Sequence, residues 1–289
     1  MKKLSQVIKP GFLLSMPYMA HLTLFFIYPV VFSLILVFHR WDVVTPMEFV
    51  GLKNFIRVFS DEVFMQSIIN TGVFLVLHIP LQIMVALFFA NLLNQKIIAR
   101  GFFRTLYFLP VVVSGVVVTI LFQQLFNYDT GLLNQFLYKL GLGQVPWLVS
   151  ENWAMPSIAF MATWKNVGLY VILFMGGLQS IPTELYEAAE LEGASSTQRF
   201  YYITLPMLNP TIVTVIVLSV IGGFSLFIEP YVMTGGGPMN STLSAVLYIY
   251  NQAFNFGHMG YASTMGLFFA VIIFTVVKIQ RKFVETEVY

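Results

Sequence analysis

The stretch "YEAAELEGASSTQRFYYITLP", residues 186–206, is a short polar segment between two long apolar runs. Together with Glu184, just before it, the segment holds four of the thirteen acidic residues, in a chain of which only 10% is charged. A solvated surface loop is the simplest explanation for such a segment. The surrounding sequence decides between that explanation and a specific docking role.

The composition is that of an integral membrane protein. Of the 289 residues, 58% are hydrophobic and 16% aromatic, and the mean hydropathy is +0.80. Soluble domains are about half apolar and about a quarter charged. The absence of cysteine from the sequence excludes disulfides, thiol catalysis and cysteine-based metal sites. A net charge of +2 gives no indication of nucleic-acid binding.

Runs without charged residues predict six transmembrane helices in a single all-α domain over residues 1–289. A helix needs about 20 apolar residues to cross the hydrocarbon core of a bilayer. Residues 152–183 contain one charged residue, Lys165, and the charge-free runs are residues 10–39, 63–95, 105–128, 200–228 and 230–277. The Gly- and Asn-rich part after residue 230 is predicted to be an outer loop with a short interfacial helix. The spans are predicted at residues 11–38, 68–94, 104–126, 154–178, 208–230 and 259–280.

The distribution of Lys and Arg predicts the orientation, because these residues are enriched on the cytoplasmic side. Both chain ends and residues 186–206 are therefore predicted to be cytoplasmic. The apolar run after "MKK" is kept as the first span, because it is too long for a signal peptide and contains Pro17 and Pro29. The predicted cytoplasmic basic residues are Lys2, Lys3, Lys9, Lys96, Arg100, Arg104, Arg199, Lys278, Arg281 and Lys282, and the predicted outer ones are Arg40, Lys53, Arg57 and Lys139.

The first half of the polar segment predicts a short helix. Thr183 is the expected N-cap, and Glu184 and Glu187 follow near the positive end of the helix dipole. Ala188 and Ala189 give this helix a face of small side chains, which favours close contact with another protein.

The second half predicts a sharp corner followed by another helix. Gly193 lies where a helix-terminating glycine is expected. Ser195 and Gln198 form a capping-box pattern that begins the second helix. This helix is expected to end at Pro206, because the residue before a proline is displaced from the helical region. The whole segment, residues 182–206, is therefore predicted to be a helical hairpin.

The hairpin sequence also matches the pattern E-A-A-x3-G-x9-I-x-L-P, through which the chain resembles the permease subunits of bacterial ATP-driven (ABC) importers. It is most similar to the sugar permeases of maltose, lactose, raffinose and glycerol-phosphate uptake systems. The resemblance covers about residues 15–285 and includes "FFRTLYFLPVVVSGVVV", "TWKNVGLYVILFMGGLQSIPTELYEAA", "MTGGGPMNST" and "GYASTMG". Glu192 replaces the usual Asp and keeps its charge. The matching residues are Glu187, Ala188, Ala189, Gly193, Ile203, Leu205 and Pro206.

This resemblance implies a location in a bacterial plasma (inner) membrane and a six-helix type I importer fold in which the hairpin is the coupling helix. The hairpin would dock in a cleft of a cytoplasmic ATPase subunit, with Glu187 pairing with a basic side chain there. The implied partners are a second homologous permease, two ATPase subunits and an extracytoplasmic sugar-binding protein that docks on the outer loops at 39–67, 127–153 and 231–258. The implied substrate is a carbohydrate, expected to be an oligosaccharide, which crosses the lipid bilayer by alternating access.

No cofactor and no enzymatic activity are expected in this chain. The sequence has no G-x-x-x-x-G-K-[ST] phosphate loop. ATP and Mg are therefore expected to bind the partner ATPase subunits. The four histidines lack metal-ligand spacing, and His78 is interpreted as a packed, hydrogen-bonded residue.

Polar and aromatic residues in the fourth and fifth spans form the predicted substrate path, because polar groups inside a membrane usually have a function. Aromatic faces and hydrogen-bonding groups together suit a sugar. The alternatives are that Lys165 pairs with Glu229 or reaches the interface, and that Trp164 and Tyr170 are interfacial anchors. The predicted path residues are Trp164, Asn166, Tyr170, Ser219, Gly223, Phe227 and Glu229.

Two other functions remain as alternatives. The first is the same type of ATP-driven importer with a glycerol-phosphate-type substrate, because Lys165 could hold an anionic group. An ion-driven secondary transporter is less favoured, because no repeat relates the two halves and Glu229 is the only candidate coupling carboxylate.

Overall fold

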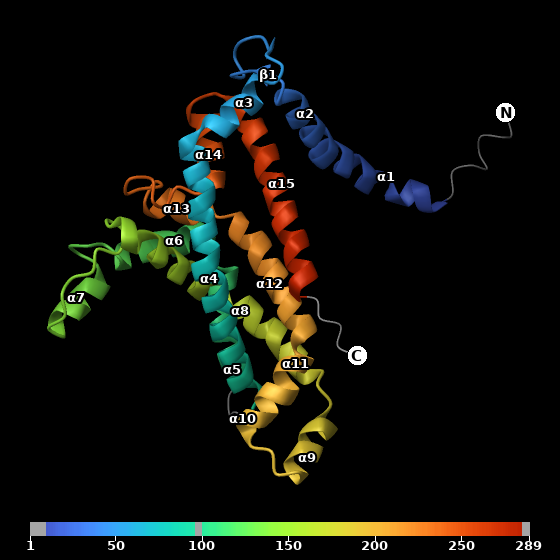
Figure 1. The fold of residues 1–289 in the computed structure, drawn as a ribbon, viewed down its shortest axis with the longest axis vertical. Helices are drawn as coiled ribbons and strands as arrows, with labels where there is room; N and C mark the ends of the chain where they lie inside the picture. The colour runs from blue at the N-terminus through green and yellow to red at the C-terminus, as the bar shows by residue number, and fades with distance from the viewer. Residues whose placement is uncertain (1–9, 96–99, 285–289) are drawn as a thin grey trace. The chain divides into compact units, whose positions relative to one another are not determined.

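The computed structural model of the protein describes residues 10–95 and 100–284, which are mainly helical (Figure 1). Lys2, Lys3, Lys9 and Lys96, four of the predicted cytoplasmic residues, lie outside the described residues. Strands β1 (His39–Arg40) and β2 (Glu48–Phe49) pair antiparallel. The helices are α1 (Pro10–Leu22), α2 (Tyr28–Leu36), α3 (Lys53–Ser60), α4 (Glu62–Asn94), α5 (Arg100–Val112), α6 (Gly115–Leu125), α7 (Leu132–Lys139), α8 (Glu151–Gln179), α9 (Thr183–Leu191), α10 (Ser196–Arg199), α11 (Leu205–Met207), α12 (Asn209–Phe224), α13 (Ile228–Met233), α14 (Ala245–Tyr250) and α15 (Met259–Val284), with π-helical turns η1 (Thr23–Ile27), η2 (Phe200–Thr204) and η3 (Asn251–Asn255).

Within the described residues, four helices are long and apolar enough to cross a membrane: Leu14–Leu36, Glu62–Asn94, Glu151–Gln179 and Met259–Gln280. Two bent pairs raise the number to six if each pair forms one span. Gly101–Val112 and Gly115–Leu125 meet at 96°, and Ser196–Met207 and Asn209–Phe224 meet at 64°. The protein is therefore a multi-pass membrane protein.

The expectation of continuous helices at 104–126 and 208–230 is wrong. The third predicted span breaks at Ser114, whose ψ of 129° lies outside the helical region. The fifth ends at Phe224, and Phe227 (φ −142°, ψ −58°) separates it from α13. Apolar composition predicts that a segment enters the membrane, but it does not reveal where the backbone leaves the helical conformation.

One compact unit of the chain contains the described residues as far as Glu62 together with Ile249–Phe269. Buried Asn54 of α3 donates its side-chain amide to the carbonyl oxygens of Val37 and His39, both at 3.0 Å. Thr264 of α15 donates to the same Val37 oxygen at 3.3 Å. These bonds satisfy the carbonyl groups left free where α2 ends.

The second compact unit contains Val63–Tyr248 and the described residues from Ala270 onward. Helix α8 is its centre and packs against α5, α6, α12 and α13. A Cβ atom at Gly168 of α8 would overlap the carbonyl oxygen of Tyr107 on α5, and one at Gly177 would meet the side chain of Thr211 on α12. Small residues at such contacts let membrane helices approach closely.

Gly168→Ala is expected to destabilise the packing of α5 against α8, by about 1–3 kcal/mol, because the added methyl group must displace backbone rather than a flexible side chain. The matched control is Gly176→Ala on the same helix, where nothing lies within 4 Å of the added Cβ. Thermal unfolding of the purified protein in detergent measures both. Equal melting temperatures for the two variants would contradict the packing argument.

Candidate functional site

The predicted hairpin exists, and its first arm is α9. The arm ends in a glycine corner: Gly193 has φ +80°, its N–H donates to Glu190 O at 3.0 Å, and the N–H of Ala194 donates to Ala189 O at 2.9 Å. This pair of bonds satisfies the last carbonyl groups of the helix and turns the chain sharply. The N-cap position belongs to Pro182 rather than to the expected Thr183, which is already helical.

The second arm begins with the predicted capping box. Ser195 Oγ accepts from the N–H of Gln198, and Gln198 Oε1 accepts from the N–H of Ser195 at 2.8 Å. The expected end at Pro206 is wrong, because Leu205 is helical (φ −65°, ψ −45°) and the chain continues into α11. The π-helical turn η2 explains the difference: Leu205 donates to Phe200 O, and Pro206 falls in the first turn of α11, where a missing N–H is tolerated.

Side-chain bonds join the two arms to each other. Arg199 Nη1 donates to Glu190 Oε2 at 2.9 Å, and the hydroxyl groups of Tyr186 and Thr204 lie 2.9 Å apart. Tyr186 and Ile203 also pack against the buried core that α4, α8 and α12 share. The hairpin is therefore attached to the transmembrane helices by both of its arms.

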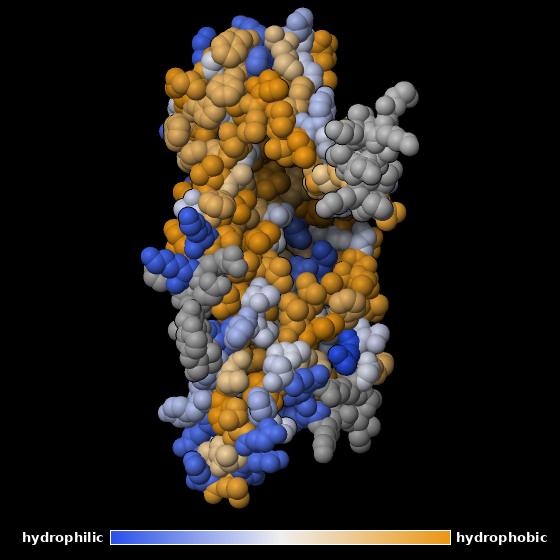
Figure 2. Space-filling view, turned by 90° about the vertical axis from the view of Figure 1, so that its right-hand side faces the viewer, coloured by the Kyte–Doolittle hydropathy of each residue, from blue (hydrophilic) through white to orange (hydrophobic). Residues whose placement is uncertain are grey.

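The outer face of the hairpin is acidic with exposed apolar side chains. Glu187 and Ala188 are exposed, and Glu187 forms no salt bridge with any described residue. Leu191 is 91% exposed and Tyr202 is 80% exposed. Figure 2 shows hydrophilic residues gathered at the lower end of the view, the end at which α9 and α10 lie in Figure 1. Exposed apolar side chains among acidic ones are a feature of a protein-docking surface.

The pattern residues of the hairpin divide between this face and its interior. Ala189, Ile203 and Leu205 are half-buried, whereas Gly193 is exposed at the corner and Pro206 is exposed in α11. A role for these residues in coupling stays a prediction.

A polar cavity of about 250 Å³ lies among α4, α8 and the break between α12 and α13. Five of the predicted path residues line it together: Asn166, Tyr170, Ser219, Gly223 and Glu229. Their role as substrate contacts stays a prediction, but their grouping around one space is a feature of the structure.

The charged residues of this cavity do not neutralise each other directly. Lys165 and Glu229 both line the cavity and are half-buried, and no salt bridge joins them within 4.0 Å among the described residues. The Lys165 ammonium instead lies beside Gly115, at the start of α6. Gln82, which is fully buried, donates its amide to Ser219 Oγ at 2.8 Å, while its Oε1 has no hydrogen-bond partner among the described residues. The cavity therefore offers a cation and a carboxylate.

Sequence analysis missed the contribution of α4 to this cavity. Asn70, Phe74, His78 and Gln82 recur every fourth residue and therefore lie along one face of the helix. The last three line the cavity. His78 is buried and hydrogen-bonded to Thr163 Oγ1 at 2.8 Å, which confirms its interpretation as a packed residue. The polar residues at this spacing within an apolar helix were the available signal.

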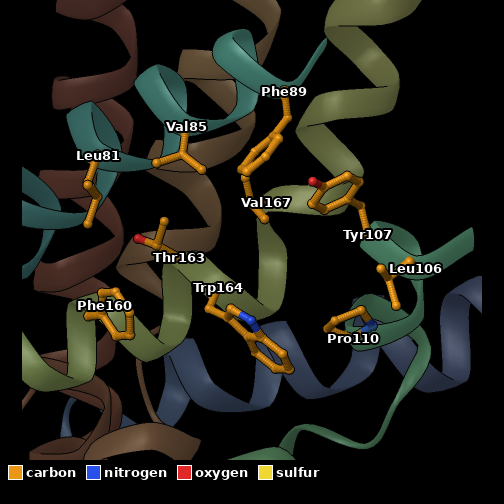
Figure 3. Close-up of a pocket in the computed structure, with 10 residues that line it drawn as sticks. All are labelled: Leu81, Val85, Phe89, Leu106, Tyr107, Pro110, Phe160, Thr163, Trp164 and Val167. Carbon is orange, nitrogen blue, oxygen red and sulfur yellow. The ribbon is translucent and has the colours of Figure 1, made fainter. Parts of the chain in front are cut away.

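Trp164 and Phe227 do not line the polar cavity. Successive residues of a helix point about 100° apart, so Trp164 faces away from the side on which Lys165 and Asn166 lie. Its indole borders a separate apolar cavity of about 400 Å³, which Figure 3 shows among side chains of α4, α5 and α8. Phe227 stacks on Tyr231, with ring centroids 5.3 Å apart.

Comparison with known proteins identifies clear relatives. Residues 82–288 match the family described as "Binding-protein-dependent transport system inner membrane component". A probable ABC transporter permease of Bacillus subtilis (strain 168) is 38% identical, covering 91% of this chain and 92% of the relative. The lactose transport system permease of Rhizobium radiobacter is also 38% identical, covering 91% and 90%. A solved bacterial alginate ABC transporter, in complex with its alginate pentasaccharide-bound periplasmic protein, has a chain with a TM-score of 0.81 and 25% identity, covering 99% of this chain and 100% of that one.

Gly193→Ala is expected to loosen the hairpin, because a left-handed conformation costs a residue with a Cβ about 1–2 kcal/mol. Hydrogen exchange of the α9 and α10 amides, which measures this opening, should become about five- to thirtyfold faster. Gly193→Asn is the matched control, since asparagine tolerates this conformation and should exchange more slowly than the alanine variant. Unchanged exchange in both variants would contradict a conformational requirement at this corner.

Proposed function

The chain belongs to the family of binding-protein-dependent transport system inner membrane components, and on that premise we propose that it is the permease subunit of an ATP-driven carbohydrate importer. It pairs with a second, related permease and with two cytoplasmic ATPase subunits, and an extracytoplasmic sugar-binding protein delivers the substrate. The similarity to a lactose permease and to a transporter bound to an alginate-loaded periplasmic protein supports this assignment.

The hairpin is the observation that carries the proposal. Its exposed acidic and apolar face suits a groove of the ATPase, where Glu187 pairs with a basic side chain. Its attachment through Tyr186, Ile203 and the Arg199–Glu190 pair transmits displacement to α8 and α12. ATP-driven closure of the ATPase subunits would thereby move the helices around the cavity from an inward-open to an outward-open arrangement. In this orientation the hairpin and both chain ends are cytoplasmic, and this chain has no catalytic step or bound cofactor of its own.

The cavity provides the chemistry expected for a carbohydrate. Hydroxyl groups can donate to Glu229 and accept from Asn166, both of which line the cavity. The Tyr170 ring offers an apolar face for a sugar ring. Few, well-placed polar groups in a cavity are typical of sites that recognise small molecules.

A phosphorylated glycerol is the second candidate substrate, and Lys165 is the observation that favours it. This half-buried ammonium group has no salt-bridge partner among the described residues and could hold an anionic group. Reconstituting the complete complex in liposomes tests both candidates. Stimulation of ATP hydrolysis by the binding protein loaded with an oligosaccharide supports the proposal. Stimulation only by glycerol phosphate favours the alternative, and transport that ignores ATP depletion contradicts both.

Glu187→Lys is expected to weaken association with the ATPase subunits by about two orders of magnitude, because it replaces an interfacial ion pair by a like-charge contact. Co-purification of the ATPase subunits and transport in proteoliposomes both measure this loss. The control is Glu184→Lys, an equal charge change at an exposed position of the same helix outside the pattern. Normal transport in the Glu187 variant, or equal losses in both, would contradict a specific pair at Glu187.

Glu229→Ala is expected to lower carbohydrate transport about tenfold at unchanged assembly of the complex, since hydrogen bonds to charged groups contribute about 1.5–3 kcal/mol. Glu229→Gln, which keeps an acceptor, should have a smaller effect. Initial uptake rates, normalised to the amount of assembled complex, distinguish the variants. Uptake kinetics that match those of the parent protein in both variants would remove Glu229 from the site.

A further inference from the structure

The outer loop at residues 234–244, "TGGGPMNSTLS", is tied to the helices that form the polar cavity. Asn70 of α4 donates its amide to Asn240 O at 2.6 Å and to Leu243 O at 3.0 Å. Just beyond the loop, the N–H of Ala245 donates to Thr71 Oγ1 at 3.0 Å. Phe74, one turn along α4 from Asn70, lines the cavity.

The loop also reaches the break between α12 and α13. Ser244, which is buried, donates its hydroxyl to Leu226 O at 2.6 Å and accepts from the N–H of Leu247 at 3.2 Å. Leu226, Ile228 and Glu229 line the cavity at this break. Here the backbone has left the helical conformation, so the Leu226 carbonyl depends on a partner from another segment.

The loop itself has a fixed shape. Thr242 donates to Gly237 O at 2.8 Å, and its hydroxyl lies 2.7 Å from that of Thr234. At the apex, Met239 and Asn240 hold the left-handed conformation (φ +47° and +60°), and Met239 is 83% exposed. Non-glycine residues held in this conformation occur where the surrounding structure determines the backbone strictly.

We propose that loop 234–244 holds the break between α12 and α13 in place and that Ser244 is the positioning residue for Glu229. The hydroxyl of Ser244 connects the loop to Leu226 O, three residues before the carboxylate. That Glu229 contacts a carbohydrate rests on the proposed function, whereas the mechanical connection to Ser244 does not.

The test uses the absence of cysteine from the sequence. Glu229→Cys provides a single reporter in the cavity, and its modification rate by 2-(trimethylammonium)ethyl methanethiosulfonate is measured in the assembled complex without sugar. Adding Ser244→Ala should raise this rate about fivefold, the factor that a hydrogen bond of typical net strength provides. A second reporter, Asn166→Cys, lines the same cavity from α8 and should be unaffected.

Two further variants control for loss of a hydroxyl and for misfolding. Ser241→Ala removes a buried hydroxyl of the same loop that has no hydrogen-bond partner in the described part of the chain, and it should leave the rate at position 229 unchanged. Ser244→Cys keeps the size of the side chain with a weaker donor and should give an intermediate rate. If the protein with Ser244→Ala fails to assemble, Ser244→Cys combined with Glu229→Cys serves as the test instead. Because the thiol at position 244 can also be modified, its own modification rate is measured in a protein that carries Ser244→Cys alone.

The proposal would be overturned if Ser244→Ala left the modification rate of the cysteine at position 229 unchanged. The absence of modification at position 229, both with Ser244 and with Ser244→Ala, would overturn it as well. So would an equal change at position 166, because that result would indicate general loosening. Neither outcome depends on the substrate. Failure to transport carbohydrate would instead contradict the proposed function and leave the labelling result standing.

Discussion

The attachment of the hairpin to the helical core is the interaction on which the rest of the account depends. A displacement at α9 can reach the cavity only if the hairpin moves as one body with the helices that adjoin it. The Arg199–Glu190 and Tyr186–Thr204 contacts join its arms, and Ile203 packs against the buried cluster formed by α4, α8 and α12. Buried Leu208 belongs to the same cluster and lies at the bend where α11 meets α12.

The breaks in the helices occur where other groups can satisfy the backbone. In a bilayer, non-helical backbone is tolerated only where protein covers it or where it borders a cavity. The interruption at Ser225–Phe227 meets this condition, because Leu226 O is bonded to Ser244 and the neighbouring residues line the polar cavity. The break at Ser114 is followed by Gly115, beside which the Lys165 ammonium lies. Both departures from helical structure therefore border the group of charged residues that the proposed function uses.

Local signals predicted the parts of the structure that local bonds determine. The Gly193 corner and the Ser195–Gln198 capping box follow from residue types at fixed spacing, and the structure contains both. The presence of apolar spans followed from composition, but their bends did not, because composition gives no weight to the residues that interrupt helices, such as Pro110 and the Ser114–Gly115 pair at the first break. Pro206 misled the prediction, since a π-helical turn absorbed its effect. The sequence predicted two of the helices that border the cavity, but not the direction in which each side chain points. Trp164 is adjacent to Lys165 in the sequence, yet its indole borders a different cavity. The place of Gln82 in the polar cavity became visible only when the structure showed α4 beside α12.

The most direct measurement of the central claim is the environment of the hairpin tip in the assembled complex. A single cysteine at Leu191, which is 91% exposed in this chain, can be labelled with an environment-sensitive fluorophore, with Met239→Cys as the reference position. The account predicts that adding the ATPase subunits shields the fluorophore at position 191, that ATP changes its signal, and that adding the ATPase subunits leaves position 239 exposed. A fluorophore at position 191 that stays fully solvent-exposed in the complete complex would contradict the account.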